Sequence, residues 1–344
     1  MLVRRSLDLN SLASQISGDT VLEGVEPWAS RVRALSKALS LLENDPWLAT
    51  RFLQHPALAK LSTNARVVGL TGLPGAGKST LTNLIVGRLR KLGKSVAVLA
   101  VDPSSTDTGG AVLGDRIRMQ DHFCDPQVYI RSMGSRGALG GVSRATRGAI
   151  RLIGLLGYDY ILVETVGIGQ SESEIVSIAD TTTLVLMPNS GDDIQLMKAG
   201  VLQMADVYVV NKCDLSNPQR MLSELRANSE ARGRGNEWTP PVLATSAAEQ
   251  QGLDEFVDAL QKHAEYEHDH PEGRAIKRKR VQTEIATNLL FILEREVQKM
   301  VAQVPDAEVN AVQAGQLPAM VVANRLFTEA FAMVQQGKIE KNST

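Results

Sequence analysis

Apolar positions recur at helical intervals near the start of the chain. The stripe, whose members lie three or four residues apart, consists of Trp28, Val32, Leu35, Leu39 and Leu42. After an interruption at residues 44–46, a second run of the same kind follows. This period is typical of amphipathic helices that bury one face. It predicts an N-terminal helical extension over residues 1–62, which we interpret as a structural flank rather than a binding site.

Between residues 63 and 266 the pattern changes to short apolar runs separated by longer amphipathic stretches. The runs cover residues 66–71, 95–101, 128–131, 160–164, 182–187, 207–211 and 242–246. Apolar runs of this length, rich in Val, Ile and Leu, are typical of strands that are buried on both faces. The stretches between them have the length of crossover helices. The alternation therefore predicts an α/β fold with a doubly wound, mostly parallel sheet.

The C-terminal part, residues 267–344, shows a third pattern. Residues 267–274 are polar and contain Pro and Gly, which predicts a linker. A helical stripe follows, made of Val281, Ile285, Leu289, Leu293, Val297 and Val301, and a last helix is predicted from Pro318 to about Val334. These helices have no sheet of their own to cover. The simplest cover is the same helix pair in a second copy, so we expect a homodimer held by a C-terminal helical arm.

Composition excludes several classes of function. The 344 residues carry 37 Lys and Arg against 38 Asp and Glu, so the net charge is -1, and no global basic field exists to hold nucleic acid or an anionic membrane. Only 4% of residues are aromatic, which disfavours base stacking on single strands. Two cysteines, Cys124 and Cys213, do not make a disulfide framework. No apolar run approaches the ~20 residues that span a bilayer. We expect a cytoplasmic protein that binds neither nucleic acid nor membrane.

A phosphate-binding loop follows the first predicted strand and opens a predicted helix. It fits the pattern G-x-x-x-x-G-K-[ST] and comprises Gly72, Leu73, Pro74, Gly75, Ala76, Gly77, Lys78, Ser79 and Thr80. Glycines let the backbone N–H groups converge on phosphate oxygens at the positive end of the helix. In this context Lys78 is expected to reach the β- and γ-phosphates, and the Ser79 hydroxyl is expected to bind Mg²⁺.

A second motif, Asn211-Lys212-Cys213-Asp214, ends another predicted strand. In this N-K-x-D pattern the Asp214 carboxylate accepts hydrogen bonds from guanine N1–H and from the exocyclic amine. Adenine lacks that pair of donors, and a mismatch of this type can cost ~10⁴-fold in selection. Ser246 and Ala247, at the end of the next strand, fit the loop whose backbone contacts guanine O6. The expected nucleotides are therefore GTP and GDP.

The sequence 160–167, Tyr-Ile-Leu-Val-Glu-Thr-Val-Gly, resembles a Walker B strand with its phosphate-sensing turn. Glu164 stands where Asp is usual and is expected to approach Mg²⁺ directly or through water. Gly167 is expected to donate its N–H to the γ-phosphate. Gln170 is a candidate for orienting the attacking water, although an exposed loop glutamine would look the same. Lys78, Glu164 and Gln170 are thus the candidate catalytic residues.

Two further carboxylates are candidate Mg²⁺ ligands. Asp102 ends the second predicted strand, where a helix cap or a turn is the alternative role, and Asp115 lies in the segment that follows. The glycine-rich segment 132–141 and the segment 189–198 are candidate mobile loops on the same side. A set of residues near the predicted linker suggests a nickel or zinc site, but we favour a solvated hinge; its members are His263, His268, His270, Glu267 and Asp269.

Together these residues resemble one family, the MeaB/ArgK-type P-loop GTPases, relatives of the human methylmalonic aciduria type A protein. The motifs that carry the resemblance are 101–105 (Val-Asp-Pro-Ser-Ser), 109–119 with Gly-Asp-Arg-Ile-Arg-Met, 136–141, 164–171 (Glu-Thr-Val-Gly-Ile-Gly-Gln-Ser), 191–195 with Gly-Asp-Asp, and 211–214. The resemblance runs from about Trp28 to about Ala330. One departure is Thr106, where many members have Pro.

The resemblance implies an Mg²⁺-dependent GTPase that acts as a chaperone of an adenosylcobalamin-dependent acyl-CoA mutase such as methylmalonyl-CoA mutase. Such proteins gate cofactor loading, protect the mutase and form homodimers through a C-terminal helical arm. The resemblance also implies that Asp102, Asp115 and Glu164 surround Mg²⁺ and that residues 191–198 form a third switch.

Three other functions remain open from the residues. A nickel-insertion metallochaperone would need a Cys/His site near the nucleotide, which Cys124 and Cys213 do not supply as a pair. An ArgK-like transport-associated ATPase or kinase would use ATP, which the N-K-x-D motif disfavours. A nucleotide-dependent dimer scaffold would hydrolyse GTP only incidentally.

Overall fold

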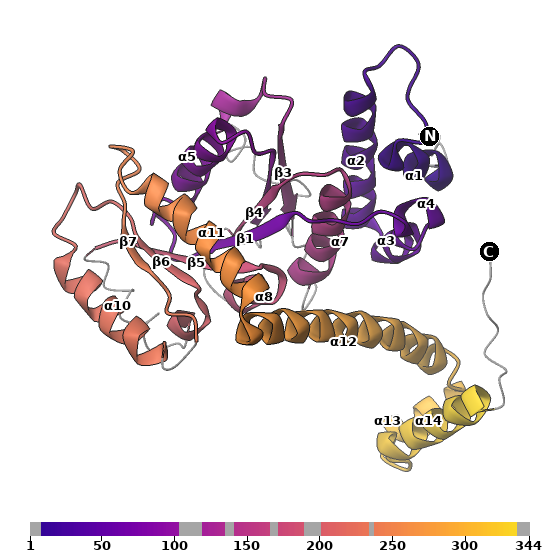
Figure 1. Cartoon of the computed structure of the whole chain (residues 1–344). Coiled ribbons are helices and arrows are strands. Elements are labelled where there is room, and N and C mark those ends of the chain that lie inside the picture. Colours follow the sequence, from indigo (N-terminus) through magenta and orange to yellow (C-terminus); the bar gives the residue numbers. More distant parts are fainter. Residues whose placement is uncertain are drawn as a thin grey trace. The chain divides into compact units, whose positions relative to one another are not determined.

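The computed structural model describes residues 8–102, 119–134, 141–165, 171–188, 201–233 and 237–335 (Figure 1). The chain divides into two compact units, residues 1–280 and residues 281–344. The first unit contains the sheet and is described first. The proposed boundaries at 62/63 and 266/267 remain predictions.

The first unit is built on a seven-stranded parallel sheet with the order β3-β2-β4-β1-β5-β6-β7. The strands are β1 (Arg66–Thr71), β2 (Val96–Asp102), β3 (Val128–Gly134), β4 (Tyr160–Thr165), β5 (Thr181–Leu186), β6 (Val207–Val210) and β7 (Val242–Ala244). This confirms the predicted doubly wound α/β fold. Because every strand runs in the same direction, all carboxyl ends meet at one edge of the sheet, and β1 lies at its centre.

Helices cover both faces of this sheet. On one face lie α5 (Lys78–Lys91) and α11 (Leu253–Asp269), which share a core with Val68 and Leu70 of β1. On the other lie α7 (Gly141–Leu155) and α8 (Ser171–Ile178). A Cβ built on Gly69 would come within 2.7 Å of Ile175 Cγ1, so β1 has room for α8 only because this position is glycine. The remaining elements are η1 (Gln120–His122), η2 (Val201–Met204) and α10 (Gln219–Arg232).

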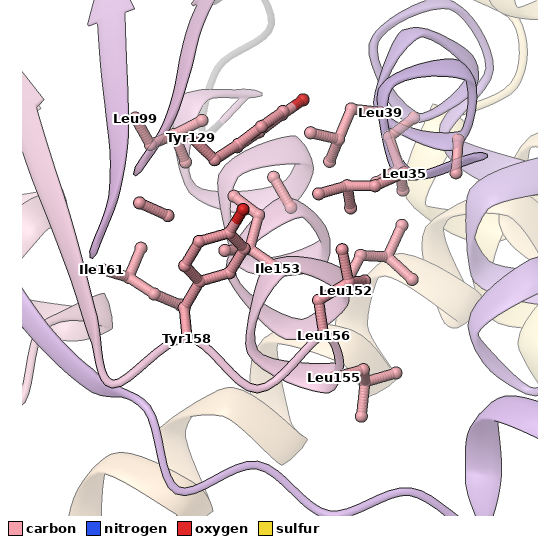
Figure 2. Close-up of a cluster of buried hydrophobic side chains, with 14 of the residues drawn as sticks. Leu35, Leu39, Leu99, Tyr129, Leu152, Ile153, Leu155, Leu156, Tyr158 and Ile161 are labelled. Carbon is pink, nitrogen blue, oxygen red and sulfur yellow. The ribbon is translucent and has the colours of Figure 1, made fainter. Parts of the chain in front are cut away.

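The N-terminal flank shares a core with the sheet. It consists of α1 (Leu9–Ser17), α2 (Pro27–Asn44), α3 (Pro46–Leu53) and α4 (Pro56–Ala59). Leu35 and Leu39 of α2, both fully buried, lie beside Leu152 of α7 and Tyr129 of β3 (Figure 2). Polar contacts reinforce this packing, since Trp28 Nε1 donates to the Pro126 carbonyl at 2.8 Å. The helical stripe predicted from the sequence is therefore confirmed as a buried face.

The segment predicted as a linker is helical instead. α11 continues to Asp269 and α12 (Pro271–Ala302) begins two residues later, so His270 alone separates the two helices. Glu267 is 2% exposed because the guanidinium groups of Arg66 and Arg280 both pair with its carboxylate. Pro271 and Gly273 lie in the first turn of α12 rather than in a loop. Proline is common at the first position of a helix, because its missing N–H would have no partner within the helix there.

The same contacts correct the prediction of a solvated hinge for His263 and Glu267. His263 is 2% exposed, with its Nδ1 2.9 Å from Thr181 Oγ1 and its Nε2 3.6 Å from Asp206 Oδ1. Burial lowers the pKa of His263 to about 3, and the two arginines act in the same direction, so the ring is neutral. Within the described ranges, no group of three or more His, Cys, Asp or Glu residues could hold a metal ion.

The second unit is helical and carries an exposed apolar face. It comprises the rest of α12 together with α13 (Asp306–Gln313) and α14 (Ala319–Gln335). The predicted stripe on α12 is open to solvent in the single chain, with Ile285 62% and Leu289 53% exposed, and Phe327 of α14 is 68% exposed. Among the helices that the structure describes, none has the length and apolar content to cross a membrane.

Candidate nucleotide-binding site

The phosphate loop connects the end of β1 to the start of α5, as the sequence predicted. Gly72 has a φ of 136°, and a Cβ there would lie 2.0 Å from the Val185 carbonyl oxygen. Gly77 has a φ of 89°, and its Cβ would lie 2.4 Å from Asn211 Nδ2. Both positions therefore require glycine for their backbone conformation and for space.

Lys78 lies under this loop. Its Nζ donates to the Gly72 carbonyl at 2.7 Å and to the Leu73 carbonyl at 3.0 Å, and the residue is 7% exposed. These bonds place the ammonium group inside the curve of the loop, at the N-terminus of α5. A glycine-rich loop at a helix N-terminus, with a lysine ammonium group inside its curve, is suited to hold phosphate groups.

Oxygen ligands gather beside the loop at the end of β4. Glu164 is 3% exposed and accepts a hydrogen bond from Ser79 Oγ at 2.5 Å on Oε1. The Thr82 hydroxyl lies 3.2 Å from the other carboxylate oxygen. A carboxylate and a hydroxyl held side by side are hard oxygen donors, which fits Mg²⁺ rather than a softer metal.

Most of the other residues that we predict near the phosphates lie outside the part of the chain that the structure describes. The backbone of Asp102 ends β2 next to β4, whose Glu164 pairs with Ala100. The Asp102 side chain, together with Asp115, Gly167 and Gln170, lies outside the described residues. So do the predicted loop residues at 104–118, 135–140 and 189–198.

Asn211 joins the phosphate loop to the guanine-type motif. The residue is 1% exposed, and its Nδ2 donates to the Ala76 carbonyl at 2.9 Å. Its Oδ1 accepts from Thr245 Oγ1 at 3.1 Å and from the Ala247 N–H at 3.2 Å. One buried amide thus ties three segments together, and each of its polar atoms has a partner.

The acceptor side of the motif is exposed. Asp214 is open to solvent, and its Oδ1 accepts from Ser246 Oγ at 2.6 Å. This bond holds the carboxylate in place next to Lys212, whose φ of 60° marks a tight turn. Burial raises the pKa of the Cys213 thiol, and its Sγ contacts the Val210 carbonyl, which fits a structural role rather than a reactive one.

The sequence analysis missed two contributors to the site. The Val185 carbonyl lies against Gly72 only because of the fold, and no local sequence signal marks it. Thr82 did have one, because it lies three residues after Ser79 on the same face of α5.

A central strand that opens into a phosphate loop, and a buried amide that joins this loop to an N-K-x-D motif, define a P-loop GTPase. The chain belongs to the family described as methylmalonyl Co-A mutase-associated GTPase MeaB, which it matches over residues 35–305. The resemblance inferred from the motifs is thereby confirmed.

Several relatives agree with this assignment. A Pyrococcus abyssi chain assigned as a GTPase is 42% identical over 269 residues, which cover 77% of this chain and 82% of that protein. The GTPase ArgK of Escherichia coli is 37% identical over 71% of this chain and 76% of its own length. The methylmalonic aciduria type A homolog of Mus musculus is 42% identical over 57% of this chain and 48% of its own length. A crystal structure titled LAO/AO transport system kinase superposes with a TM-score of 0.62 at 25% identity, covering 96% of this chain and 99% of that chain.

Proposed function

We propose that this GTPase is a nucleotide-dependent chaperone that gates the loading of adenosylcobalamin into an acyl-CoA mutase of the methylmalonyl-CoA mutase type and protects that mutase. The observation that carries the proposal is the match over residues 35–305 to a family described by its association with methylmalonyl-CoA mutase. The mouse relative, named for methylmalonic aciduria, supports the same client.

We assign roles to the site residues from their places in the sequence motifs. Lys78 binds the β- and γ-phosphates, the loop N–H groups of residues 72–80 hold the phosphate oxygens, and Gly167 donates to the γ-phosphate. Ser79 and Glu164, with Asp102 and Asp115, hold Mg²⁺, which when bound neutralises charge on the phosphate oxygens. Gln170 orients the attacking water.

The base is held by a second group of residues. Asp214 accepts from guanine N1–H and the exocyclic amine, and Ser246 keeps its carboxylate in place. Asn211 fixes the distance between the base pocket and the phosphate loop, because it bonds to both. Lys212 and the backbone of Ala247 complete the pocket.

The topology supports a switch rather than a metabolic enzyme. The segments after β2, β3, β4 and β5 all leave the carboxyl edge of the sheet, where the phosphate loop also lies. Segments at that edge can contact the γ-phosphate and present a different surface to a partner after hydrolysis. We propose that residues 104–119, 132–141, 167–174 and 189–198 serve this purpose in the cytoplasm.

The experiment titrates the client mutase, apo or cofactor-loaded, against this protein in the presence of GDP or a non-hydrolysable GTP analogue. We expect the mutase to bind one nucleotide state about 5–150-fold more tightly, equivalent to a coupling of ~1–3 kcal/mol, and by linkage to tighten that nucleotide by the same factor. Isothermal titration calorimetry measures both affinities. No complex in either state, with unchanged GTP turnover and unchanged cofactor loading, would reject the chaperone role and leave the GTPase assignment standing.

We also propose that the second unit forms a two-fold homodimer through its exposed apolar face. Leu289→Glu is expected to convert the dimer to a monomer, because a two-fold contact places the buried charge in the interface twice. Sedimentation velocity at micromolar concentration measures the change. Leu92→Glu, at an apolar side chain of the first unit that is 56% exposed, is the matched control and should leave the dimer intact.

The substitution Leu289→Glu tests the dimer more specifically than removal of the C-terminal helices would. Removing the chain from residue 274 onward would also remove Arg280, which pairs with the buried Glu267. A wild-type chain that sediments as a monomer under these conditions would contradict the proposal.

A further inference from the structure

We propose that Thr82 is a positioning residue that fixes the Glu164 carboxylate beside Ser79, in the orientation that a divalent cation at the phosphate loop requires. The inference rests on the proposed function, because it takes Ser79 and Glu164 as the cation ligands. It adds a residue that lies outside the loop motif and whose contact is made across the core.

The geometry holds both oxygens of one carboxylate. Glu164 Oε1 is 2.5 Å from Ser79 Oγ, and Oε2 is 3.2 Å from Thr82 Oγ1. Thr82 is 0% exposed and Glu164 is 3% exposed, so water does not easily substitute for the Thr82 hydroxyl. The two hydroxyl residues lie three positions apart on α5 and present neighbouring groups to the end of β4.

A second hydrogen bond to the carboxylate restrains a glutamate side chain more than it would restrain the aspartate that is usual at this position. The extra methylene adds one rotatable bond, so a contact to each carboxylate oxygen restrains glutamate more than it restrains aspartate. The Ser79 hydroxyl has one proton and two lone pairs, and by donating to Glu164 it leaves a lone pair for the cation. The bond from Thr82 then fixes the plane of the carboxylate.

Thr82 is well suited to this task. Its Oγ1 also lies 2.9 Å from the Lys78 carbonyl, which directs the hydroxyl back along the helix toward the loop. When Glu164 is ionised, the charged oxygen is the stronger acceptor for the single proton. β-Branching restricts χ1, so the hydroxyl is held in place before the cation arrives.

The test compares Thr82→Val, which keeps the shape and removes the hydroxyl, with Thr82→Ser, which keeps the hydroxyl. The readout is the Mg²⁺ concentration that half-maximally slows the release of a fluorescent GDP analogue, a measurement that does not depend on hydrolysis. A hydrogen bond to a charged group is among the stronger hydrogen bonds in proteins, so Thr82→Val should raise this concentration at least about tenfold. Thr82→Ser should restore it to within about threefold, and GDP affinity in EDTA should change less than about twofold in either variant.

A matched control is available at Thr183. It is also fully buried, and within the part of the chain that the structure describes its hydroxyl has no hydrogen-bond partner. Thr183→Val is therefore expected to leave the Mg²⁺ requirement unchanged, which separates loss of the Thr82–Glu164 bond from loss of any buried hydroxyl. Thr82→Ala provides a second deletion if the valine variant folds poorly.

Glu164→Gln separates this inference from the proposed function. If Glu164→Gln leaves the Mg²⁺ requirement unchanged, Glu164 is not a cation ligand and the proposed metal site is wrong. If Glu164→Gln raises the requirement while Thr82→Val does not, or if serine fails to restore it, Thr82 has no positioning role and only this inference is overturned.

Discussion

Asp214→Asn is expected to remove most of the preference for guanine over adenine nucleotides and to weaken GTP binding at least about 100-fold. The carboxylate accepts from two donors on guanine, whereas an amide presents one acceptor and one donor, so one guanine N–H loses its partner and faces another donor. Ser246, which holds Asp214 Oδ1 at 2.6 Å, still orients the replaced side chain. Competition against a fluorescent guanine nucleotide measures the change.

The same variant should gain affinity for xanthosine triphosphate, because xanthine carries a carbonyl where guanine carries the exocyclic amine. The amide then donates to that carbonyl and accepts from N1–H. Asp306→Asn, at an exposed position in the first turn of α13, is the control and should change neither preference. Equal competition by ATP and GTP against the wild-type protein would show that Asp214 does not read guanine.

The parts of the fold and the site that follow from local pattern could be predicted from the sequence. The strand that ends at Thr71, the glycines of the loop and Lys78 are contiguous, so their spacing alone indicates the motif. The parallel order of the strands follows from the alternation of apolar runs and helices. Asn211 was recognised in the same way, although its bond to the Ala76 carbonyl required the structure.

The features that the sequence could not reveal depend on pairs of residues far apart in the chain. Glu267 lies in a polar stretch with proline and glycine, which is typical of a linker, and the partners that bury it are Arg66 and Arg280. Arg66 begins β1, far from Glu267 in the sequence, so no local window contains both of these residues. Thr82 is an intermediate case, because its place three residues after Ser79 is a local signal, whereas its contact with Glu164 joins α5 to β4 and required the structure.

Glu267→Gln is expected to lower the free energy of unfolding of the first unit by about 3 kcal/mol. The carboxylate pairs with Arg66 at 2.5 Å and with Arg280, and these side chains are only 16% and 19% exposed. A neutral amide of the same shape leaves two largely buried guanidinium groups without their counter-charge. Removing one partner of a buried ion pair typically costs ~3–5 kcal/mol of unfolding free energy. Because the arginines are partly exposed, we expect a loss near the lower end of this range.

Nearby groups do not replace the lost charge. Asp206 also faces Arg280, at 4.0 Å, but burial raises its pKa to about 6, so part of its charge is already lost in mildly acidic solution. His263 is neutral. Its Nδ1 lies 3.2 Å from Arg66 Nη2 and accepts a hydrogen bond from it, but a neutral ring supplies no negative charge. The two arginines would therefore have to draw in water or separate, and either response loosens the junction of α11 with β1 and α12.

Urea unfolding followed by tryptophan fluorescence measures this effect on the first unit alone, since Trp28, Trp47 and Trp238 all precede residue 281. Trp238 is a direct reporter, because its ring centroid lies 4.8 Å from that of His263. The control is Glu296→Gln, which breaks an exposed pair with Lys299 and should cost less than about 1 kcal/mol. A loss below about 1 kcal/mol for Glu267→Gln as well would mean that the buried charges are already solvated, and that hydrophobic packing rather than ion pairing holds the start of α12 to the sheet.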